Sequence, residues 1–557
     1  MALSPIRVLT LLLARRVQTC CQSQSSLTLS VRRSTTVAQP VDKGDDRPKL
    51  IDESKVKPFE AIPGQQSKLA TYINVFRNGG LARLDKYFTW RRNTLGPIWK
   101  ESIGTLSGVV VADPSATEAV VRAEGKYPRR MPMEPWLLYR KMGGYSLGVL
   151  LAEGEDWQRH RSVLLKPLLR PKEVASHTDT LNEVSDDLIA KIRRVHATPG
   201  KSSSTMDDEL ARWSTEGMAA ILFNRRLGLL SDSVDPMSEE FINATKDFFR
   251  YSEALFFLPF KLQVKLNLPA WKGVRRTAKS IFDITQFHIK ESIAAKKRSG
   301  DDSNIDDDGH IRHIIQYMND SGKLTDGEIL ASTAELFGAA VDTTSSTMVW
   351  TLDLLAWNRN VQEKLHKEIT GVVKKGDKIT QEHLKHLHYL KAVIRESMSQ
   401  TDQNFHERSL LAKSPVETTV GFVEHLYSVA PFFNRILASD VILGGYHFPA
   451  GTTVIVHVGL MSHDPQFFDN PDKFIPERWL RSDKPIPRLN QFAALPFATG
   501  PRQCIGRRLA ELEMYLCLAK IVQNFILEPN SDRPLKPRMR LLLAGDKPLN
   551  LKFVERL

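Results

Sequence analysis

This chain of 557 residues has little cysteine and no long apolar run. It contains only four cysteines, and two of them, Cys20 and Cys21, fall in a leader-like segment, so a disulfide framework is excluded and a reducing compartment is expected. The N-terminal apolar run, Val8 to Ala14, is far shorter than the roughly 20 residues that cross a bilayer, so we expect no N-terminal membrane anchor. With 25% charged and 42% hydrophobic residues, a membrane-embedded bundle and a disordered chain are excluded as well.

Internal repeats and long Gly/Ser or Pro-rich linkers are also lacking, which favours one large domain over residues 67–557. From Leu69 onward, segments with helical periodicity alternate with short β-like pieces. The β-like pieces are Val109 to Val111 and the run Asp440 to Val458, which Gly444-Gly445 punctuates as a turn. The sequence therefore predicts a fold that is mainly α with a small β region.

The first forty residues contain no acidic residue but five arginines, with many Ser and Thr. This composition is typical of a mitochondrial transit peptide, which we assign to residues 1–40; a disordered basic tail and a secretory signal are the alternatives. Removal of the leader reduces the formal charge from +13 to +8, and no compact basic and aromatic stripe follows, so nucleic acid is not an expected partner. Residues 41–66 are polar and are predicted to form a surface lead-in.

An acidic stretch, Ser299 to Gly309, briefly resembles a calcium-binding loop through Asn304, Asp306 and Asp308. Ile315 stands where such a loop supplies its bidentate carboxylate, so we interpret the stretch as a solvated connection instead.

The strongest chemical signal is the segment from Phe497 through Gly500, Arg502 and Cys504 to Gly506. Apolar residues at 505, 509, 512 and 516 then mark one helical face, so Cys504 is expected at a helix start, where backbone N–H groups and the helix dipole favour a thiolate. A single cysteine is too few for a zinc site but sufficient as the axial ligand of a haem iron, with Arg502 available to pair a propionate. A buried structural cysteine is the alternative, and it leaves the spacing of glycine and arginine unexplained.

This segment resembles the haem-binding signature of the cytochrome P450 family, with Ala498 where the family usually has glycine. The resemblance covers nearly all of the chain after the leader, and it implies the cytochrome P450 fold, haem b with Cys504 as iron ligand, and monooxygenation of a C–H bond with dioxygen. Trp157 and Arg161, four residues apart on one helical face, resemble the family's pair of propionate-binding residues.

Three further segments carry the resemblance. Asp342 and Thr343 follow the small residues Gly338, Ala339 and Ala340, as in the family's central helix, where an acid and an alcohol relay protons to bound dioxygen. Without the haem signature, such a polar pair would be interpreted as a satisfied core hydrogen bond. Arg435 matches another propionate contact, and Arg478 matches the arginine of a buried ion network behind the cysteine.

The pattern breaks at the family's Glu-x-x-Arg motif, which should complete that ion network. Glu396 is present, but the arginine position holds either Ser399 or His425, and an unpatterned stretch, Ser399 to Glu424, lies between them. We interpret this insert as an unremoved intron, a splice variant or an error in the coding sequence, because the family pattern is intact on both sides. If the insert is genuine, Glu396 and Arg478 lack their usual partner, and the chain is expected to bind haem poorly.

Two basic clusters are expected on the side of the cysteine. Lys391 and Arg395 share a helical face, and Arg507 and Arg508 follow Cys504. From charge alone an ordinary solvated face is an equal interpretation. The clusters resemble those by which mitochondrial members of the family bind a small, adrenodoxin-like ferredoxin, which its reductase supplies with electrons.

The sequence gives little information about the identity of the substrate. The segment Tyr127 to Leu150 is a candidate pocket wall, and Leu255 to Phe260 is a candidate for peripheral membrane contact, although ordinary core is the alternative for both. The candidate pocket residues in the first segment are Met131, Met133, Trp136, Leu137 and Met142.

The sequence therefore predicts a mitochondrial monooxygenase, on the matrix side of the inner membrane, that hydroxylates a lipophilic, sterol-like or steroid-like substrate. One alternative is a non-catalytic or misfolded isoform that binds at most haem or lipid. Another is a relative that isomerises or dehydrates an oxygenated substrate without external electrons, which the Asp342-Thr343 pair disfavours.

Overall fold

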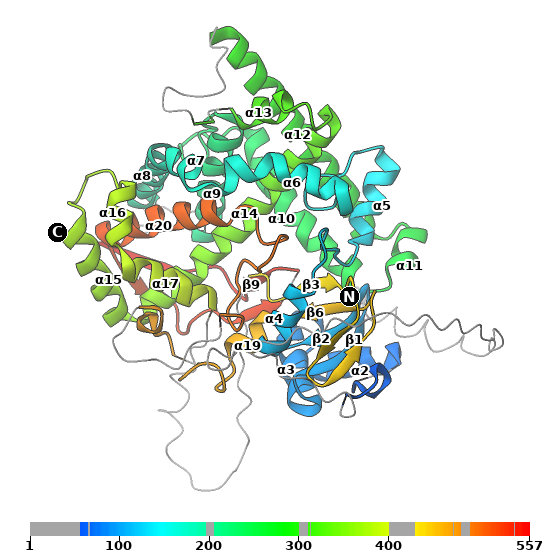
Figure 1. Ribbon diagram of the computed structural model, residues 1–557. Helices are drawn as coiled ribbons and strands as arrows, with labels where there is room; N and C mark the ends of the chain where they lie inside the picture. The colour runs from blue at the N-terminus through cyan, green and yellow to red at the C-terminus, as the bar shows by residue number, and fades with distance from the viewer. Residues whose placement is uncertain are drawn as a thin grey trace, which may run out of the picture. The chain divides into compact units, whose positions relative to one another are not determined.

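Helices account for most of the described chain (Figure 1). The computed structural model describes residues 56–64, 67–195, 205–299, 310–311, 313–399, 429–471, 473–480, 491–539 and 541–556. The α-helices are α2 (Lys68–Arg77), α3 (Leu84–Leu95), α4 (Pro114–Arg122), α5 (Glu134–Gly143), α6 (Gly154–Leu169), α7 (Pro171–Ser176), α8 (Thr178–Val195), α9 (Met206–Phe223), α10 (Pro236–Phe257), α11 (Phe260–Lys265), α12 (Pro269–Ser299), α13 (Ile314–Asp320), α14 (Asp326–Trp357), α15 (Arg359–Val372), α16 (Gln381–His386), α17 (His388–Ser399), α19 (Val458–Ser462) and α20 (Arg507–Asn524). The prediction of a mainly helical fold is confirmed.

Several predicted segments lie outside the described residues. These are the leader, most of the lead-in, the insert after Ser399, His425, and the acidic stretch after Ser299. Ser299 itself ends α12 rather than beginning a loop. The described part of the lead-in is attached to the core: the Lys57 N–H donates to the Gly445 carbonyl over 2.9 Å, and Ile62 is 2% exposed.

Helix α14 is the central element of the helical region (Figure 1). It begins with a capping box, in which Thr325 and Glu328 bond each other's backbone N–H groups, and its 32 residues span about 48 Å at 1.5 Å per residue. It packs against α9, α10, α12, α17 and α20, so most of its side chains are buried. A helix in this position places residues from its middle at the centre of the molecule.

A four-stranded sheet forms the largest part of the β region. Its order is β1 (Ile98–Ile103), β2 (Leu106–Val111), β6 (Thr453–Val456) and β3 (Phe433–Ile436). β2 and β6 are parallel, and the other two pairs are antiparallel. The sheet joins residues near 100 to residues near 450, and α2 and α3 pack against β1.

The remaining strands form three two-stranded sheets: β4 (Val441–Leu443) with β5 (Tyr446–Phe448), β7 (Phe525–Pro529) with β10 (Leu551–Glu555), and β8 (Pro537–Met539) with β9 (Leu543–Gly545). The β4–β5 hairpin turns through Gly444 and Gly445, which both have positive φ, as the glycine pair predicts. The strands predicted at 109–111 and within 440–458 are confirmed.

One extensive hydrophobic core joins these layers, and Trp99, Trp157 and Trp213 are among its fully buried side chains. The predicted apolar face of α20 belongs to it, because Leu509, Leu512 and Leu516 are buried. All described residues belong to one compact unit. None of the helices in the described part of the chain is both long and apolar enough to span a bilayer.

Candidate functional site

The loop before α20 presents Cys504. The Cys504 N–H donates to the Phe497 carbonyl over 3.0 Å, and the Gln503 N–H donates to the Gly500 carbonyl over 3.0 Å, which closes the loop on itself. Gly500 has φ +80°, and a Cβ there would lie 2.7 Å from Glu124 Oε2, so both conformation and space require glycine. Gly506 has φ −85°, so its backbone does not require glycine, and a Cβ there would lie in ordinary contact with Cys504 Sγ, at 4.0 Å.

Ala498 adopts the left-handed conformation, with φ +54°. This conformation is costly for a residue with a Cβ, which explains why glycine suits the position. Ala498 therefore occupies a backbone conformation that is strained for alanine but not for glycine.

The thiol of Cys504 has surface that solvent can reach, whereas Cys517 is buried. The protein around Cys504 is nevertheless dense enough that burial raises the pKa of its thiol above the usual value, although the Gly506 N–H and the Arg161 guanidinium act in the opposite direction. Cys504 therefore keeps some exposed surface although its thiol is largely surrounded by protein atoms. The Gly506 N–H, just before the first helical residue Arg507, favours the thiolate in the expected direction, but desolvation outweighs it.

Arginines gather beside this loop. Arg502 donates from Nε to the Pro128 carbonyl over 2.8 Å and from Nη1 to the Ala152 carbonyl over 3.1 Å. The pKa of Arg502 is lowered to about 9, first by burial and then by the positive charges of Arg130, Arg435 and Arg161, against the opposing charge of Glu153. These four arginines, which we call the arginine cluster, therefore create a buried excess of positive charge.

Helix α6 places Trp157 and Arg161 beside the cysteine loop. The Arg502 guanidinium lies 4.2 Å from the centroid of the buried Trp157 ring, and Arg161 interacts electrostatically with both Cys504 and Arg502. The two residues predicted from the sequence to share a helical face thus lie together beside the cysteine loop.

Arg435, on β3, is buried and multiply bonded. Its Nε donates to Glu124, and its Nη2 donates to the Thr499 carbonyl over 3.1 Å. Glu124 keeps one carboxylate oxygen, Oε2, without a hydrogen-bond partner among the described residues. Arg435 therefore links the sheet to the cysteine loop.

Asp342 and Thr343 lie in the middle of α14, and both are half-buried. Thr343 Oγ1 donates to the Ala339 carbonyl over 2.8 Å, which leaves the oxygen's lone pairs available as acceptors. Thr343, Gly338 and Ala339 line the cavity described next, whereas Asp342 is not among its lining residues.

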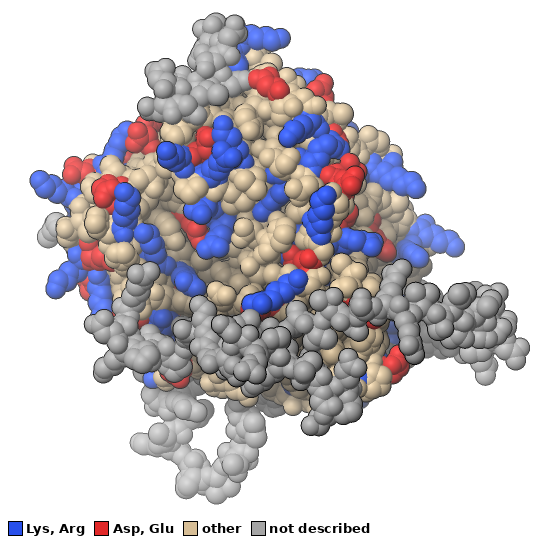
Figure 2. Space-filling model, in the orientation of Figure 1, with Lys and Arg blue, Asp and Glu red and all other residues tan. Residues whose placement is uncertain are grey.

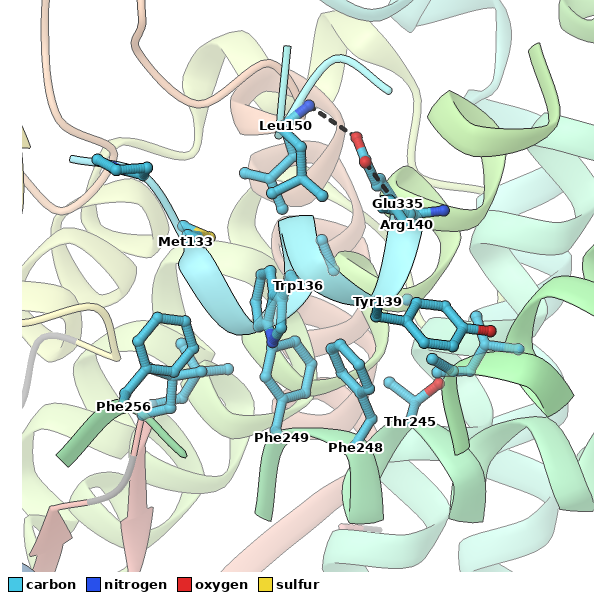
Figure 3. A pocket seen from close by; sticks show the side chains of 18 of the residues that line it. Met133, Trp136, Tyr139, Arg140, Leu150, Thr245, Phe248, Phe249, Phe256 and Glu335 are labelled. Atoms are coloured by element: carbon cyan, nitrogen blue, oxygen red, sulfur yellow. Dashed lines mark hydrogen bonds and ion pairs between the residues drawn. The ribbon is translucent and has the colours of Figure 1, made fainter. Parts of the chain in front are cut away.

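A cavity of about 310 Å³ lies among α5, α10, α12, α14 and the β region (Figure 3). Its wall is mainly apolar and aromatic and includes Met133, Trp136, Phe248, Phe249 and Phe256. Such a lining suits a lipophilic molecule of moderate size.

The cavity and the cysteine loop share wall segments. Leu151 lines the cavity, and the next residue, Ala152, bonds Arg502; Asn434 lines it, and the next residue is Arg435. The segments around residues 151 and 434 therefore connect the cavity wall to the cysteine loop.

The expected pocket residues are correct in part. Met131, Met133 and Trp136 line the cavity, and the Trp136 Nε1 donates to Ser252 Oγ over 2.9 Å. Leu137 and Met142 do not line it: Leu137 packs against the core, and Met142 is exposed. The helical period of α5 explains the difference, since only one face of this helix can contact the cavity.

The segment Leu255 to Phe260 does not offer a membrane-contacting surface. Leu255, Phe256, Phe257 and Phe260 are all buried, and Phe256 and Phe257 line the cavity. Packing at the end of α10 turns these side chains inward, so the expectation of membrane contact through them is wrong.

Glu396 and Arg478 form an ion pair. Glu396 is 0% exposed; its Oε1 lies 3.1 Å from Arg478 Nε and accepts the Ile475 N–H over 2.8 Å, and its Oε2 accepts the Trp479 Nε1–H over 2.6 Å. Ser399 is buried, and its hydroxyl bonds the Glu396 carbonyl over 3.2 Å rather than the carboxylate. Burial raises the pKa of Glu396 to about 7 in spite of Arg478 and the other donors, so one arginine does not fully compensate the desolvation of this carboxylate.

The basic residues predicted to bind a partner come from two helices. The charge of Arg507 lowers the pKa of Arg395, after the larger effect of burial, so the start of α20 lies near the end of α17. Arg395, Arg507 and Arg508 are exposed, and Lys391 is half-buried. Over the face shown in Figure 2, basic and acidic side chains are interspersed.

The sequence did not single out Glu124, Arg130, Arg140, Thr245 or Glu335. Arg130 belongs to the arginine cluster, Glu124 pairs with Arg435, and the other three line the cavity. Only the isolated charge of Glu335 within an apolar stretch gave a signal, and a charge pattern alone does not reveal its contact with Arg140, 195 positions away.

Comparison with known proteins agrees with this geometry. The family model described as Cytochrome P450 matches residues 63–398 and 426–553, and the gap between the two matches covers the unpatterned stretch after Met398. The chain is 33% identical over 504 residues to the mitochondrial 25-hydroxyvitamin D-1 alpha hydroxylase of Homo sapiens, covering 89% of this chain and 92% of that protein. It is 32% identical over 521 residues to the mitochondrial sterol 26-hydroxylase of Mus musculus (92% and 91% covered), and 32% identical over 512 residues to Cytochrome P450 10 of Lymnaea stagnalis (90% and 87% covered). The chain therefore belongs to the cytochrome P450 family and is a cytochrome P450 monooxygenase.

Proposed function

We propose that this chain is a mitochondrial haem-thiolate monooxygenase that hydroxylates a lipophilic, sterol-like substrate with electrons from a ferredoxin. The observation that carries the proposal is the apolar cavity, which Thr343 lines and whose wall residues Leu151 and Asn434 are followed directly by residues that bond the Cys504 loop. This arrangement suits a substrate held between a dioxygen-binding helix and an iron ligand.

The residues around Cys504 suit haem b. Burial disfavours the thiolate of Cys504, so a neighbouring metal cation is what would stabilise it. The arginine cluster needs anions, and Arg502 Nη2 lies 2.8 Å from Glu153 Oε2 without hydrogen-bond geometry, which leaves it as a buried donor for another acceptor. A haem supplies both, through its iron and its two propionates.

In this proposal Cys504 holds the iron, and Arg502, Arg161, Arg435 and Trp157 hold the propionates. When bound, the haem-thiolate activates dioxygen so that one oxygen atom enters a C–H bond and the other leaves as water. Phe497, Gly500 and Gly506 shape the loop so that the thiol is presented and the flat cofactor can approach.

Asp342 and Thr343 are the proposed proton relay. The Thr343 hydroxyl borders the cavity and can accept a hydrogen bond, and Asp342 is the adjacent acid on the same helix. Asp342 would take protons from the solvent side and pass them toward the Thr343 oxygen.

The cavity lining and the relatives support a sterol-like substrate. The relatives include a 25-hydroxyvitamin D-1 alpha hydroxylase and a sterol 26-hydroxylase, and the lining here is mainly aromatic and aliphatic. Such a wall gains free energy by removing apolar ligand surface from water.

A ferredoxin is the proposed electron donor. The exposed residues Arg395, Arg507 and Arg508, with Lys391, form a basic area beside the cysteine loop, which suits an acidic partner. The mitochondrial relatives and the leader composition support the same donor.

The same relatives support a mitochondrial location, on the matrix side of the inner membrane. Exposed apolar side chains of α2 (Leu69, Ile73 and Phe76) and of the α11 region (Leu262 and Leu266) support peripheral membrane contact. Tyr72 of α2 donates to the Phe257 carbonyl over 2.9 Å, so these two regions are neighbours. Membrane contact is thus assigned to α2 and α11 rather than to residues 255–260.

A second candidate is an inactive isoform. The raised pKa of Glu396 and the serine at position 399 favour it, because the network behind Cys504 has one arginine where the family pattern has two.

One experiment separates the two candidates. The reduced, carbon monoxide-bound absorption spectrum is recorded for the full chain and for a version that lacks residues 399–424 and carries His425→Arg. A thiolate-type Soret band in both proteins supports the enzyme, and a band only in the shortened version supports the inactive isoform. No such band in either protein contradicts the assignment of Cys504.

The electron donor is tested separately. The shortened or full protein that gives the band is supplied with NADPH, ferredoxin reductase and ferredoxin, and product is measured on a sterol panel. A diflavin reductase is the matched alternative donor, and turnover with it alone would contradict the ferredoxin proposal.

A further inference from the structure

Two polar side chains of the cavity wall have donors without acceptors. Arg140, on α5, is 7% exposed, and Thr245, on α10, is 0% exposed; both line the cavity. Within the described part of the chain, neither Arg140 Nη1 nor Thr245 Oγ1 has a hydrogen-bond partner. Buried donors are normally satisfied, so these two point to a ligand that supplies the missing acceptor.

The surroundings of Arg140 fix its guanidinium. Its Nη2 lies 3.2 Å from Glu335 Oε1, and its carbon Cζ lies 4.0 Å from the centroid of the Phe282 ring. Glu335 in turn accepts the Gly148 N–H over 3.2 Å and the Leu150 N–H over 2.7 Å (Figure 3). The carboxylate therefore accepts three hydrogen bonds and holds the arginine in place, while Nη1 has no partner among the described residues.

Thr245 lies on the same side of the cavity as Glu335 (Figure 3). A Cβ on Gly338 would lie 4.0 Å from Thr245 Cγ2, and Gly338 is three residues from Glu335 on α14. In Figure 3 Arg140, Glu335 and Thr245 lie on one side of the cavity, and Met133 and Phe256 lie on the other. Thr343 follows Glu335 by eight residues, a rise of about 12 Å along the helix.

The charges at this end favour a neutral ligand group. Glu335 already balances Arg140, and the described residues provide no other charged side chain in the cavity wall. A carboxylate would approach Glu335 and would lose its own hydration, whereas a hydroxyl or keto oxygen would not add charge.

We propose that Arg140 and Thr245 bind a neutral acceptor oxygen of the substrate, a hydroxyl or keto group, and thereby direct oxidation to a carbon near Thr343, about two helical turns away. The inference rests on the proposed monooxygenase function and adds a polar end to its lipophilic substrate. Arg140 and Thr245 are then specificity-determining residues.

The test uses matched ligands on the haem-loaded enzyme. One series is 5α-cholestan-3β-ol, 5α-cholestan-3-one and 5α-cholestane; the other is 1-dodecanol, dodecane and dodecanoic acid. Binding is measured as Kd from the Soret shift and, independently, as the change in Tm, and the oxidised carbon is located by mass spectrometry. Loss of one hydrogen bond to a neutral oxygen lowers affinity by about tenfold, so the alcohol or ketone should bind at least that much more tightly than the hydrocarbon.

Three variants separate binding from folding. Thr245→Val keeps the side-chain shape, and Arg140→Lys keeps the charge but removes the forked donor. Each should weaken the oxygenated ligand by about tenfold and leave the hydrocarbon within about twofold. Thr333→Val is the matched control, because Thr333 is also buried on α14 with an unpartnered Oγ1 among the described residues but does not line the cavity.

Each outcome is decisive. Equal binding of oxygenated and hydrocarbon ligands, equal loss of both in Thr245→Val, or tighter binding of the acid than of the alcohol overturns the inference. If only the dodecane series binds, the sterol-like part of the proposed function fails while the inference is judged on that series. If no compound of either series binds, both fail.

Discussion

Replacing Ser399 by arginine should change how the stability of this protein depends on pH. Ser399 is three residues after Glu396 on α17, where the family pattern places an arginine beside the carboxylate. The pKa of Glu396 is raised from its usual 4.5 to about 7, so the folded state binds this proton more tightly than the unfolded state. The stability that the proton provides is complete below about pH 4.5 and is lost as the pH rises through about 7.

The size of this pH effect follows from the shift in the pKa of Glu396. A difference of about 2.5 pKa units corresponds to a loss of roughly 3 kcal/mol of unfolding free energy between pH 4.5 and pH 8. An arginine that pairs with Glu396 should return its pKa toward 4.5 and remove most of this loss. Insertion of a large side chain at buried Ser399 costs about 1 to 3 kcal/mol, but this cost is the same at every pH and does not affect the slope.

The assay is urea denaturation of the haem-loaded protein at pH 5, 6, 7 and 8, with Tm as a second readout. Ser399→Met is the control, because it adds similar bulk without charge and should keep the wild-type slope. If Ser399→Arg and Ser399→Met lose the same free energy between pH 5 and pH 8, either Glu396 does not titrate in this range or the arginine does not reach it, and the reasoning is refuted.

Three further predictions concern the cysteine loop and the basic area. Ala498→Gly should stabilise the protein by about 0.5 to 1 kcal/mol in urea denaturation, because it relieves φ +54°; unchanged or lower stability would contradict the strain. Gly500→Ala should lose more unfolding free energy, and more bound haem per chain, than the control Gly451→Ala. Both glycines have positive φ, but only a Cβ at position 500 would meet a neighbour within 4 Å. Equal losses in the two variants would show that contact with Glu124 is unimportant. Arg508→Glu should raise the KM for ferredoxin by about tenfold with little change in kcat. The control is Arg250→Glu, which changes an exposed charge on α10 and should alter this KM by less than about twofold. Equal effects of the two variants would contradict docking at the start of α20.

The cysteine loop shows which features the local sequence can predict. The order of Phe497, Gly500, Arg502, Cys504 and Gly506 sufficed to predict a haem-type loop before a helix, because turn glycines and helical periodicity are local properties. The same sequence did not predict the direction of the thiol pKa. Burial decided it, and burial depends on which other segments pack around the loop.

The cavity shows what the local sequence could not predict. The sequence predicted that residues 127–150 supply part of the wall, and Met131, Met133 and Trp136 do so. It did not separate these from Leu137 and Met142, and it placed residues 255–260 at a membrane, because an apolar side chain has the same local pattern whether it meets core, ligand or lipid.

Consecutive residues are enough to identify the family, the mainly helical fold with its glycine-turned hairpin, and the missing arginine after Glu396, since motif spacing and helical period are local properties. Packing of distant segments decides that Arg130 joins the arginine cluster, that Glu124 pairs with Arg435 and Glu396 with Arg478, and that Arg140 and Thr245 line one cavity. These contacts join residues that are many positions apart, and their energies depend on burial and distance, which exist only after the chain has packed.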